Sequence, residues 1–286
     1  WHGYFDPLPF LFEKLAELKP ARIAVLGMER MPWKVHTWLG QTLGVELVPV
    51  DEHLNLLRRV KAPLEVQLLR EAVRVTDLAF TEVQPLLRPG ANEIEIAAAI
   101  SYTFRKNSCA DAFFPGVLGG IDADTAVIAR KPRPRPLENG DTVMIDIGAA
   151  YQGYMADVAR TYVLGQPSAL QQHAWDTIRR AHEAVLALCK PGTPCIRLHQ
   201  TAQAIIEAAG YTLDHRIGHG FGLATSFEWP NLIAETAELQ PGNTLALEPA
   251  IYKVGAGAMK IEDNVVITET GWEVLSKSRI SLEVAS

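Results

Sequence analysis

Four carboxylates and one imidazole follow one another along the second half of the chain, next to apolar residues or glycines. Asp146 lies in the apolar run 143–148, and Asp157 follows eleven residues later. A carboxylate surrounded by apolar side chains is costly to bury unless it is paired or bound to a cation. His219 lies between two glycines, where the backbone and a ligand can approach each other closely. The other two acids of the set are Glu248 and Glu262.

This set of side chains suits a divalent metal ion better than a structural site built from thiolates. Carboxylates and an imidazole offer oxygen and nitrogen donors to Mn, Fe, Co or Zn. Two such ions that share bridging carboxylates would balance four negative charges. Each of these acids, taken alone, would more commonly be an exposed or ion-paired residue. Their occurrence in order, each in a strand or a glycine-flanked turn, favours a metal site.

The elements that must position these residues alternate between pairs of helices and groups of strands. Apolar residues recur every three or four positions from 64 to about 87, and Pro89-Gly90 ends this predicted helix. The alternation predicts an α+β fold with antiparallel sheet. Further helices are predicted at 92–104, 168–189 and 196–209, and strands at 142–147, 155–164, 244–252, 259–268 and 272–275.

The first 58 residues form a separate predicted domain, and residues 59–286 form the catalytic one. Only two strand signals are visible in the first domain, and two strands alone make a poor sheet. We therefore expect 1–58 to be part of a larger α/β domain. The chain begins with Trp1 rather than Met, and we expect further sequence upstream of it. The helix and strand signals of this domain lie at 10–18, 22–27, 34–43 and 45–50.

The composition excludes several classes of protein. The 286 residues include 27 Lys and Arg against 33 Asp and Glu, a net charge of −6, and 48% are apolar, so a disordered or fibrous chain is excluded. Nucleic acid is not an expected partner, because no concentrated run of basic residues is present. A membrane is not expected either, since no apolar stretch is long enough to span one. Cys109, Cys189 and Cys195 lack metal-binding or redox spacing, which indicates reduced thiols in a cytoplasmic protein.

The order of the five side chains resembles that of the pita-bread metallopeptidase family, which includes methionine aminopeptidase, prolidase, aminopeptidase P and the metal-free creatinase. The resemblance covers about residues 62–278 and implies a pita-bread fold. Residues 1–58 resemble an incomplete N-terminal α/β domain of the prolidase, aminopeptidase P and creatinase branch, which methionine aminopeptidase lacks. The matching motifs are Gly140-Asp141, 146–148, Tyr154, Asp157, Arg160-Thr161, 218–223, Glu248-Pro249 and 261–263.

Carried over by position, the resemblance implies a site for two divalent metal ions, with Mn, Co, Zn and Fe as the candidates. Asp146 would chelate one ion. Asp157 and Glu262 would bridge both ions. His219 and Glu248 would bind the other ion.

The resemblance also implies which groups act on the substrate. A water between the two ions would be the nucleophile, and Glu248 beside it would be the general base. His215 matches a family preference for a His four residues before the metal-binding His, and we expect it to be catalytic. The expected substrate-binding residues are Phe113, Phe114 and Glu228. The implied reaction is hydrolysis of Xaa-Pro dipeptides, or removal of the first residue of Xaa-Pro peptides, by a homodimer.

Two departures from the family pattern leave the substrate open. Xaa-Pro peptidases carry a His seven residues after the metal-binding His, where Ser226 or Phe227 stands in this chain. They carry another His in the stretch that corresponds to 129–132, which contains none. One alternative is therefore the same metal site acting on a small non-peptide molecule, such as an amidine, an ectoine-like solute or a sulfonium propionate. Another alternative is a non-catalytic pita-bread module that binds proteins, although that class has usually lost its metal ligands.

Overall fold

A computed structural model describes most of the chain. The described residues divide between Arg58 and Arg59 into two compact units, and each is described by itself below. Phe114, Ser226 and Phe227 lie outside the described residues. The described ranges are 8–113, 115–120, 131–224, 228–252 and 254–284.

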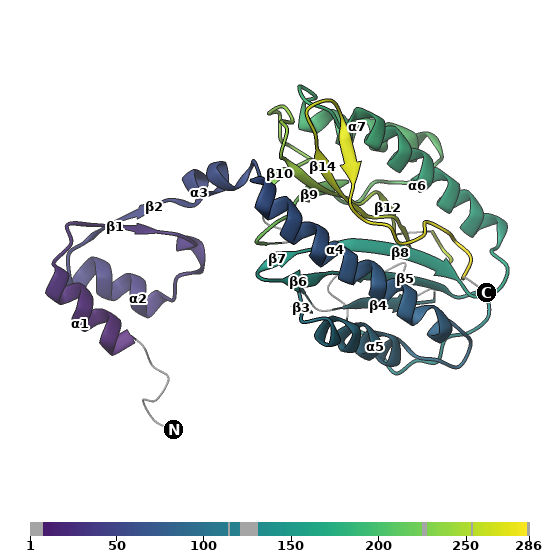
Figure 1. The fold of residues 1–286 in the computed structure, drawn as a ribbon, viewed down its shortest axis with the longest axis horizontal. Helices are drawn as coiled ribbons and strands as arrows, with labels where there is room; N and C mark the ends of the chain where they lie inside the picture. The colour runs from purple at the N-terminus through teal and green to yellow at the C-terminus, as the bar shows by residue number, and fades with distance from the viewer. Residues whose placement is uncertain (1–7, 114, 121–130, 225–227, 253, 285–286) are drawn as a thin grey trace. The chain divides into compact units, whose positions relative to one another are not determined.

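The first unit contains a two-stranded parallel sheet, with Ile23 of one strand opposite Leu47 of the other (Figure 1). The helix predicted at 34–43 is only partly α-helical, because it changes to a π-helical turn in its second half. Gly40 lies in that turn and lowers its preference for a regular α-helix. The elements are α1 (Leu8–Leu18), β1 (Arg22–Val25), a 3-10 turn (Met28–Arg30), α2 (Trp33–Thr37), the π-turn (Trp38–Thr42), β2 (Glu46–Pro49) and α3 (Asp51–Arg58).

The second unit repeats one arrangement twice, a pair of helices followed by antiparallel strands, and this confirms the α+β prediction. Two longer helices begin at side-chain caps: Asn92 Oδ1 accepts the backbone N–H groups of Ile94 and Glu95, and Ser168 Oγ accepts that of Gln171. The helices are α4 (Pro63–Val83), α5 (Glu93–Lys106), α6 (Ala169–Leu188) and α7 (Cys195–Ala208), with a 3-10 turn at Gln84–Leu86.

The strands of the second unit form several small antiparallel sheets. One has the order β4-β5-β8, and one has the order β10-β9-β11-β14-β15. The pair β12-β13 and the three-stranded sheet β3-β6-β7 complete the set. The strands are β3 (Ala110–Asp111), β4 (Gly116–Gly119), β5 (Thr142–Ile147), β6 (Ala149–Tyr151), β7 (Tyr154–Met155), β8 (Val158–Val163), β9 (Gly218–Gly220), β10 (Glu228–Asn231), β11 (Thr244–Leu247), β12 (Ala250–Ile251), β13 (Met259–Lys260), β14 (Asp263–Ile267) and β15 (Trp272–Val274).

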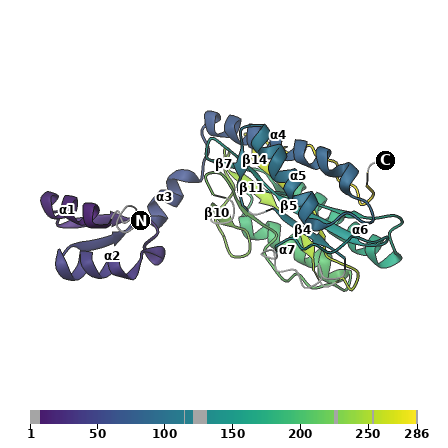
Figure 2. The ribbon, with the colours of Figure 1, turned by 90° about the horizontal axis from the view of Figure 1, so that it is seen from below.

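Helices of the second unit cover both groups of strands. α6 and α7 lie side by side over β11 to β14, and α5 lies beside β3 and β4 (Figures 1 and 2). α4 packs against both groups, because Leu69 and Val73 lie in one apolar cluster with Ala156 from the first group and Val266 from the second. This packing holds the two groups of strands together around a common centre.

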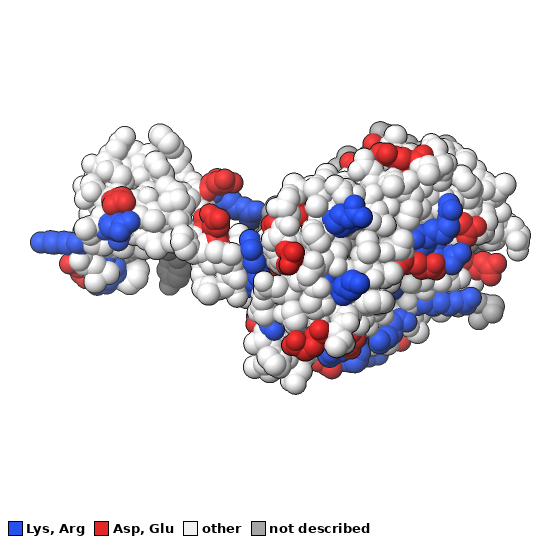
Figure 3. All heavy atoms as spheres, turned by 90° about the horizontal axis from the view of Figure 1, so that it is seen from above, with Lys and Arg blue, Asp and Glu red and all other residues white. Residues whose placement is uncertain are grey.

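The surface of the second unit has no single dominant charge on the face drawn in Figure 3. Basic and acidic side chains are interspersed there. Among the described residues, no helix combines the length and the apolar character that crossing a bilayer requires.

Candidate metal centre and active site

Three of the predicted strands are interrupted, and each interruption falls at or next to a predicted metal ligand. The strand expected at 155–164 is broken at Asp157, which lies between β7 and β8. The strand expected at 244–252 is broken at Glu248, because Pro249 has no N–H group to donate to a ladder. The strand expected at 259–268 is divided at Ile261, next to Glu262, which forms an isolated bridge with Ala159. Breaks in the ladders thus set these carboxylates at the ends of short strands.

The other two predicted ligands lie within strands. Asp146 on β5 is opposite Gly116 of β4, and a Cβ atom on that glycine would lie 3.2 Å from the Asp146 carbonyl oxygen. His219 is the central residue of β9 and lies opposite Ala246 of β11. All five predicted ligands are buried, with at most 5% of each residue exposed.

The structure brings these side chains together around one point. Ligand atoms of Asp157, His219 and Glu262 all lie within 4.8 Å of one another. His219 Nε2 is 3.6 Å from Asp157 Oδ2 and 3.5 Å from Glu248 Oε1. Residues from β5, β9 and three loops therefore meet at a centre that no local stretch of sequence could form.

Lys260, which the motif reasoning did not single out, places its ammonium group inside this cluster. Its Nζ lies 2.7 Å from Asp146 Oδ2, 2.8 Å from Glu248 Oε2 and 3.0 Å from Glu262 Oε2. Burial alone would lower the pKa of Lys260, but these three carboxylates outweigh burial and raise it well above its usual value. The structure therefore already has one buried cation among its carboxylates.

The Lys260 ammonium and the Arg216 guanidinium, whose Nε lies 3.4 Å from Glu248 Oε1, together do not balance four carboxylates, and the acid pKa values reflect this. Burial, followed by repulsion from neighbouring carboxylates, raises the pKa of Asp157 well above its ordinary value. The pKa of Glu262 is also raised, again mainly by burial, and its Oε1 has no hydrogen-bond partner among the described residues. A divalent cation would relieve both penalties, so the donor set fits the metal ions that the sequence predicts.

Glu248 differs from these two acids. Burial would raise its pKa, but the Lys260 ammonium, which lies 2.8 Å from Glu248 Oε2, outweighs burial and lowers the pKa to about 2. Glu248 is therefore ionised at neutral pH. The surroundings thus lower the pKa of Glu248 and raise the pKa values of Asp157 and Glu262, although all three lie in one cluster.

The imidazole of His219 is oriented as a metal ligand would be. Its Nδ1 donates to the carbonyl oxygen of Gly220 at 2.9 Å, which leaves Nε2 facing the carboxylates. Burial lowers the pKa of His219, and the neutral imidazole is the form that binds metals.

The backbones of two ligands are held from behind by buried polar residues. Asn264 accepts the N–H group of Asp157 through Oδ1 at 3.0 Å and donates to its carbonyl oxygen through Nδ2 at 2.7 Å. Arg160 donates to the carbonyl oxygen of Glu262 at 2.7 Å and pairs with Asp263 at 2.7 Å. Such outer contacts fix the direction of the ligand side chains.

The remaining predicted site residues lie at different places. His215 is partly buried near Glu248, and burial lowers its pKa. Its ring meets that of Tyr252 edge-on, with centroids 5.0 Å apart. Phe113 is half-buried against the turn at Gly148, where a Cβ atom would lie 3.0 Å from the Phe113 ring.

Glu228 is held by protein groups in this structure. Its Oε2 pairs with Lys61 Nζ at 2.8 Å, and each side chain is only 2% exposed. Its Oε1 accepts the backbone N–H group of Ala224 at 3.0 Å. The carboxylate also fills the space where a Cβ atom on Gly222 would lie. Glu228 therefore holds the backbone at Gly222 and Ala224, and its contact with a substrate is a prediction.

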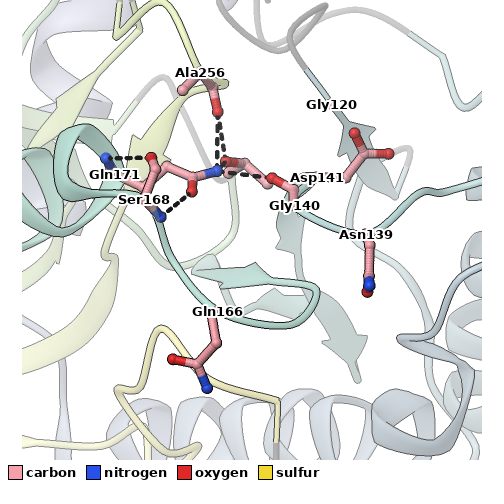
Figure 4. Close-up of a pocket in the computed structure, with 9 residues that line it drawn as sticks. Gly120, Asn139, Gly140, Asp141, Gln166, Ser168, Gln171 and Ala256 are labelled. Atoms are coloured by element: carbon pink, nitrogen blue, oxygen red, sulfur yellow. Dashed lines mark hydrogen bonds between the residues drawn. The ribbon is translucent and has the colours of Figure 1, made fainter.

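A cavity of about 350 Å³ is lined by none of the clustered carboxylates (Figure 4). It is lined by Thr142, at the opposite end of β5 from Asp146. Gln171 on its wall donates to the carbonyl oxygen of Gly140 at 2.9 Å and to Thr142 Oγ1 at 3.0 Å. These polar groups are thus satisfied within the wall itself.

Comparison with known proteins places the chain in a family. The sequence profile of Metallopeptidase family M24 matches residues 67–269. An uncharacterized peptidase of Bacillus subtilis, YqhT, is 32% identical over 236 residues, which cover 82% of this chain and 66% of that protein. An Xaa-Pro dipeptidase of Pyrococcus furiosus is 31% identical over 242 residues, which cover 83% of this chain and 68% of that protein. The chain thus spans just under two-thirds of the Bacillus relative.

Solved structures agree with the sequence comparison. An X-Pro aminopeptidase from Thermotoga maritima superposes with a TM-score of 0.88 at 29% identity, over 98% of this chain and 79% of that one. A prolidase from Pyrococcus furiosus gives a TM-score of 0.87 at 28% identity, over 94% of this chain and 80% of that one. These similarities confirm the pita-bread fold that the motifs predict. The chain belongs to metallopeptidase family M24, and it is similar to the prolidases and aminopeptidases of that family.

Proposed function

We propose that the chain is a metal-dependent hydrolase that cleaves Xaa-Pro dipeptides or removes the N-terminal residue from peptides with Pro in second position. The observation that carries this proposal is the buried cluster of four carboxylates and one neutral imidazole, with too little positive charge to balance it. A relative named Xaa-Pro dipeptidase and a solved X-Pro aminopeptidase support the choice of substrate.

Five side chains would hold the metal. Two divalent ions are proposed, with manganese as the first candidate and Co, Zn or Fe as others, because carboxylate oxygens and one imidazole suit each of them. When bound, such ions supply a Lewis acid and a water of lowered pKa. The proposed ligands are Asp146, Asp157, His219, Glu248 and Glu262.

Two residues of the chain are proposed to move or hold protons. Hydrolysis joins the water oxygen to the carbonyl carbon, breaks the bond from carbon to the proline nitrogen, and leaves a proton on that nitrogen. Glu248 is ionised at neutral pH and is proposed to accept the proton of the attacking water. His215 lies partly buried near Glu248, burial lowers its pKa and so favours the neutral ring, and we propose that it assists this proton transfer.

The residues of the substrate pocket, the oligomeric state and the cellular compartment are also proposed. Phe113, which packs at the turn following Asp146, is proposed to contact the substrate, together with Phe114 and Glu228. We also propose a homodimer that works on small peptides in the cytoplasm. The three cysteines are free and buried, which is consistent with a reducing compartment.

A second candidate function has one specific observation in its favour. Ser226 or Phe227 stands where Xaa-Pro peptidases of the family carry a His. The same metal site could then act on a small non-peptide molecule, such as an amidine, an ectoine-like solute or a sulfonium propionate.

A substrate panel separates the two candidates. Protein depleted of metal with a chelator would be supplied with Mn or Co and tested on Xaa-Pro dipeptides, longer Xaa-Pro peptides and the small molecules. Dipeptides with Ala in place of Pro are the matched controls. Release of free proline, and little cleavage of the Ala controls, is the expected result. Cleavage of no peptide with any metal would refute the peptidase proposal.

A further inference from the structure

His182 is a buried histidine on α6 to which no role has been assigned so far. It lies on the inner face of the helix, one turn after Ile178, and only 2% of it is exposed. Its Nε2 lies 3.1 Å from Asp263 Oδ2 and has no other hydrogen-bond partner in the described part of the chain. Asp263 directly follows the proposed metal ligand Glu262. A helix that supplies none of the proposed ligands thus touches the residue next to one of them.

The side chain of Asp263 is ionised, and its two oxygens accept from different groups. Burial would raise its pKa, but the charge of Arg160 and the hydrogen bonds from His182 and Ser276 outweigh burial and hold the pKa well below its ordinary value. Oδ1 accepts from Arg160 at 2.7 Å and from Ser276 Oγ at 2.6 Å. Oδ2 faces His182. Because an ionised carboxylate can only accept, the proton between these two side chains is carried by Nε2 of His182.

One branch of contacts leads from Asp263 to Glu262. The Arg160 guanidinium also donates, through Nη1, to the carbonyl oxygens of Ala159 at 2.8 Å and of Glu262 at 2.7 Å. Ala159 and Glu262 form an isolated bridge, in which the Glu262 N–H group donates to the Ala159 carbonyl oxygen at 3.0 Å. Arg160 thus holds the backbone from which the Glu262 carboxylate extends.

A second branch of contacts leads from Asp263 to Asp157. The Ser276 hydroxyl that donates to Asp263 also accepts the backbone N–H group of Asn264 at 3.2 Å. The side chain of Asn264 in turn holds the N–H group and the carbonyl oxygen of Asp157. Asp263 is therefore a common anchor for Asp157 and Glu262, the two carboxylates that are proposed to bridge the ions.

We propose that His182 is a positioning residue of the metal centre and acts through Asp263, an inference that rests on the metal site proposed above. By holding Oδ2, the imidazole keeps the Asp263 carboxylate from turning away from the donors at Oδ1. The Asp157 and Glu262 carboxylates are then held in fixed positions before an ion binds. Such preorganisation raises the affinity for the ion, because less freedom is lost on binding.

The test compares two polar substitutions whose nitrogen atoms lie at different distances along the side chain. The amide nitrogen of glutamine reaches about as far as Nε2 of histidine, whereas that of asparagine reaches only about as far as Nδ1. We therefore expect His182→Gln to keep the contact with Asp263 and His182→Asn to lose it. His199→Asn is the matched control, because His199 is a buried histidine on α7 with no hydrogen bond or ion pair to Asp263 in the described part of the chain.

Calorimetric titration of chelator-treated protein with Mn measures the affinity. We expect His182→Asn to weaken Mn binding about 10- to 100-fold, which is the usual effect of losing an outer contact of a metal site. His182→Gln should change the affinity much less, and the control should bind Mn as the wild type does. Thermal unfolding of each metal-free protein shows whether the variants are folded.

The absorption spectrum of the Co-loaded protein is a second readout, which a general loss of stability would not change. The bands of Co(II) depend on how its ligands are arranged. At saturating Co, His182→Asn should alter the bands, and His199→Asn should reproduce the wild-type spectrum. Ser276→Ala removes a donor from the other oxygen of Asp263 and should also weaken Mn binding, so it serves as the test if His182→Asn does not fold.

Several results would overturn the assignment, and they can be told apart. Unchanged Mn affinity in folded His182→Asn, or in Ser276→Ala if the former does not fold, refutes the role of His182 and leaves the metal site intact. An equal loss of affinity in His182→Gln or in the control also refutes it, because the nitrogen that contacts Asp263 would then not matter. A wild type that binds no divalent ion refutes the metal site and this inference together.

Discussion

Replacing Lys61 with Met tests whether the buried ion pair with Glu228 holds the segment that follows His219. The two side chains meet at 2.8 Å, and each is 2% exposed. Removing one partner of such a pair leaves an uncompensated buried charge, which costs about 3–5 kcal/mol. The Ala224 N–H group still donates to Glu228, so we expect the lower end, about 3 kcal/mol. In a unit of this size that corresponds to a fall in Tm of about 6–12 °C.

Thermal unfolding followed by circular dichroism, supported by urea unfolding, measures this change. Arg179→Met is the control, because Arg179 pairs with Glu183 at the same 2.8 Å on the surface, with both side chains about half exposed. Exposed pairs contribute about 0.2–1 kcal/mol, so the control should hardly change the Tm. Adding Glu228→Gln to Lys61→Met should recover part of the loss, since the orphaned charge is then removed. Equal Tm shifts in Lys61→Met and the control would refute the reasoning.

Three further predictions follow from the site. Asp157→Asn should weaken divalent metal binding at least about 100-fold in calorimetric titration, and unchanged affinity would contradict its place as a ligand. Metal affinity should keep rising with pH above the usual carboxyl range, with release of protons, because the pKa values of Asp157 and Glu262 are raised and an ion must displace their protons; a flat profile would contradict this. Gly220→Ala should lower stability by about 3 kcal/mol, because its Cβ atom would lie 1.8 Å from the Trp229 carbonyl oxygen, whereas Gly271→Ala meets nothing within 4 Å and should fold normally.

Local signals in the sequence predicted the longer elements well. The strand at 142–147 has the bounds of β5, and the helix expected at 64–87 is α4, Pro63–Val83. These elements carry strong periodicity or apolar runs. The sequence does not predict short strands rich in glycine, such as β9, because glycine is depleted in strands. Glycine is needed in β9 because a Cβ atom on Gly218 would lie 2.4 Å from the Ala246 carbonyl oxygen.

The cluster of carboxylates contains both residues that the sequence identifies and residues that only the structure places there. Asp157 and Glu262 could be singled out because a carboxylate in an apolar strand is unusual at any single position. Lys260 could not, since a lysine in a strand is commonplace. Its place in the site depends on the antiparallel pairing of β12 with β13, which joins two segments across a loop. The role of this lysine depends on the register of strand pairing and not on the local sequence.

The central claim is that the buried carboxylates hold divalent metal on which peptide hydrolysis depends. The most direct measurement combines metal content with turnover of an Xaa-Pro dipeptide on the same sample, before chelation, after chelation and after titration with Mn. We expect chelated protein to be inactive and turnover to return as the chain binds Mn, reaching its maximum near two ions per chain. Turnover that survives complete removal of metal, or a chain that binds no divalent ion, would contradict the account.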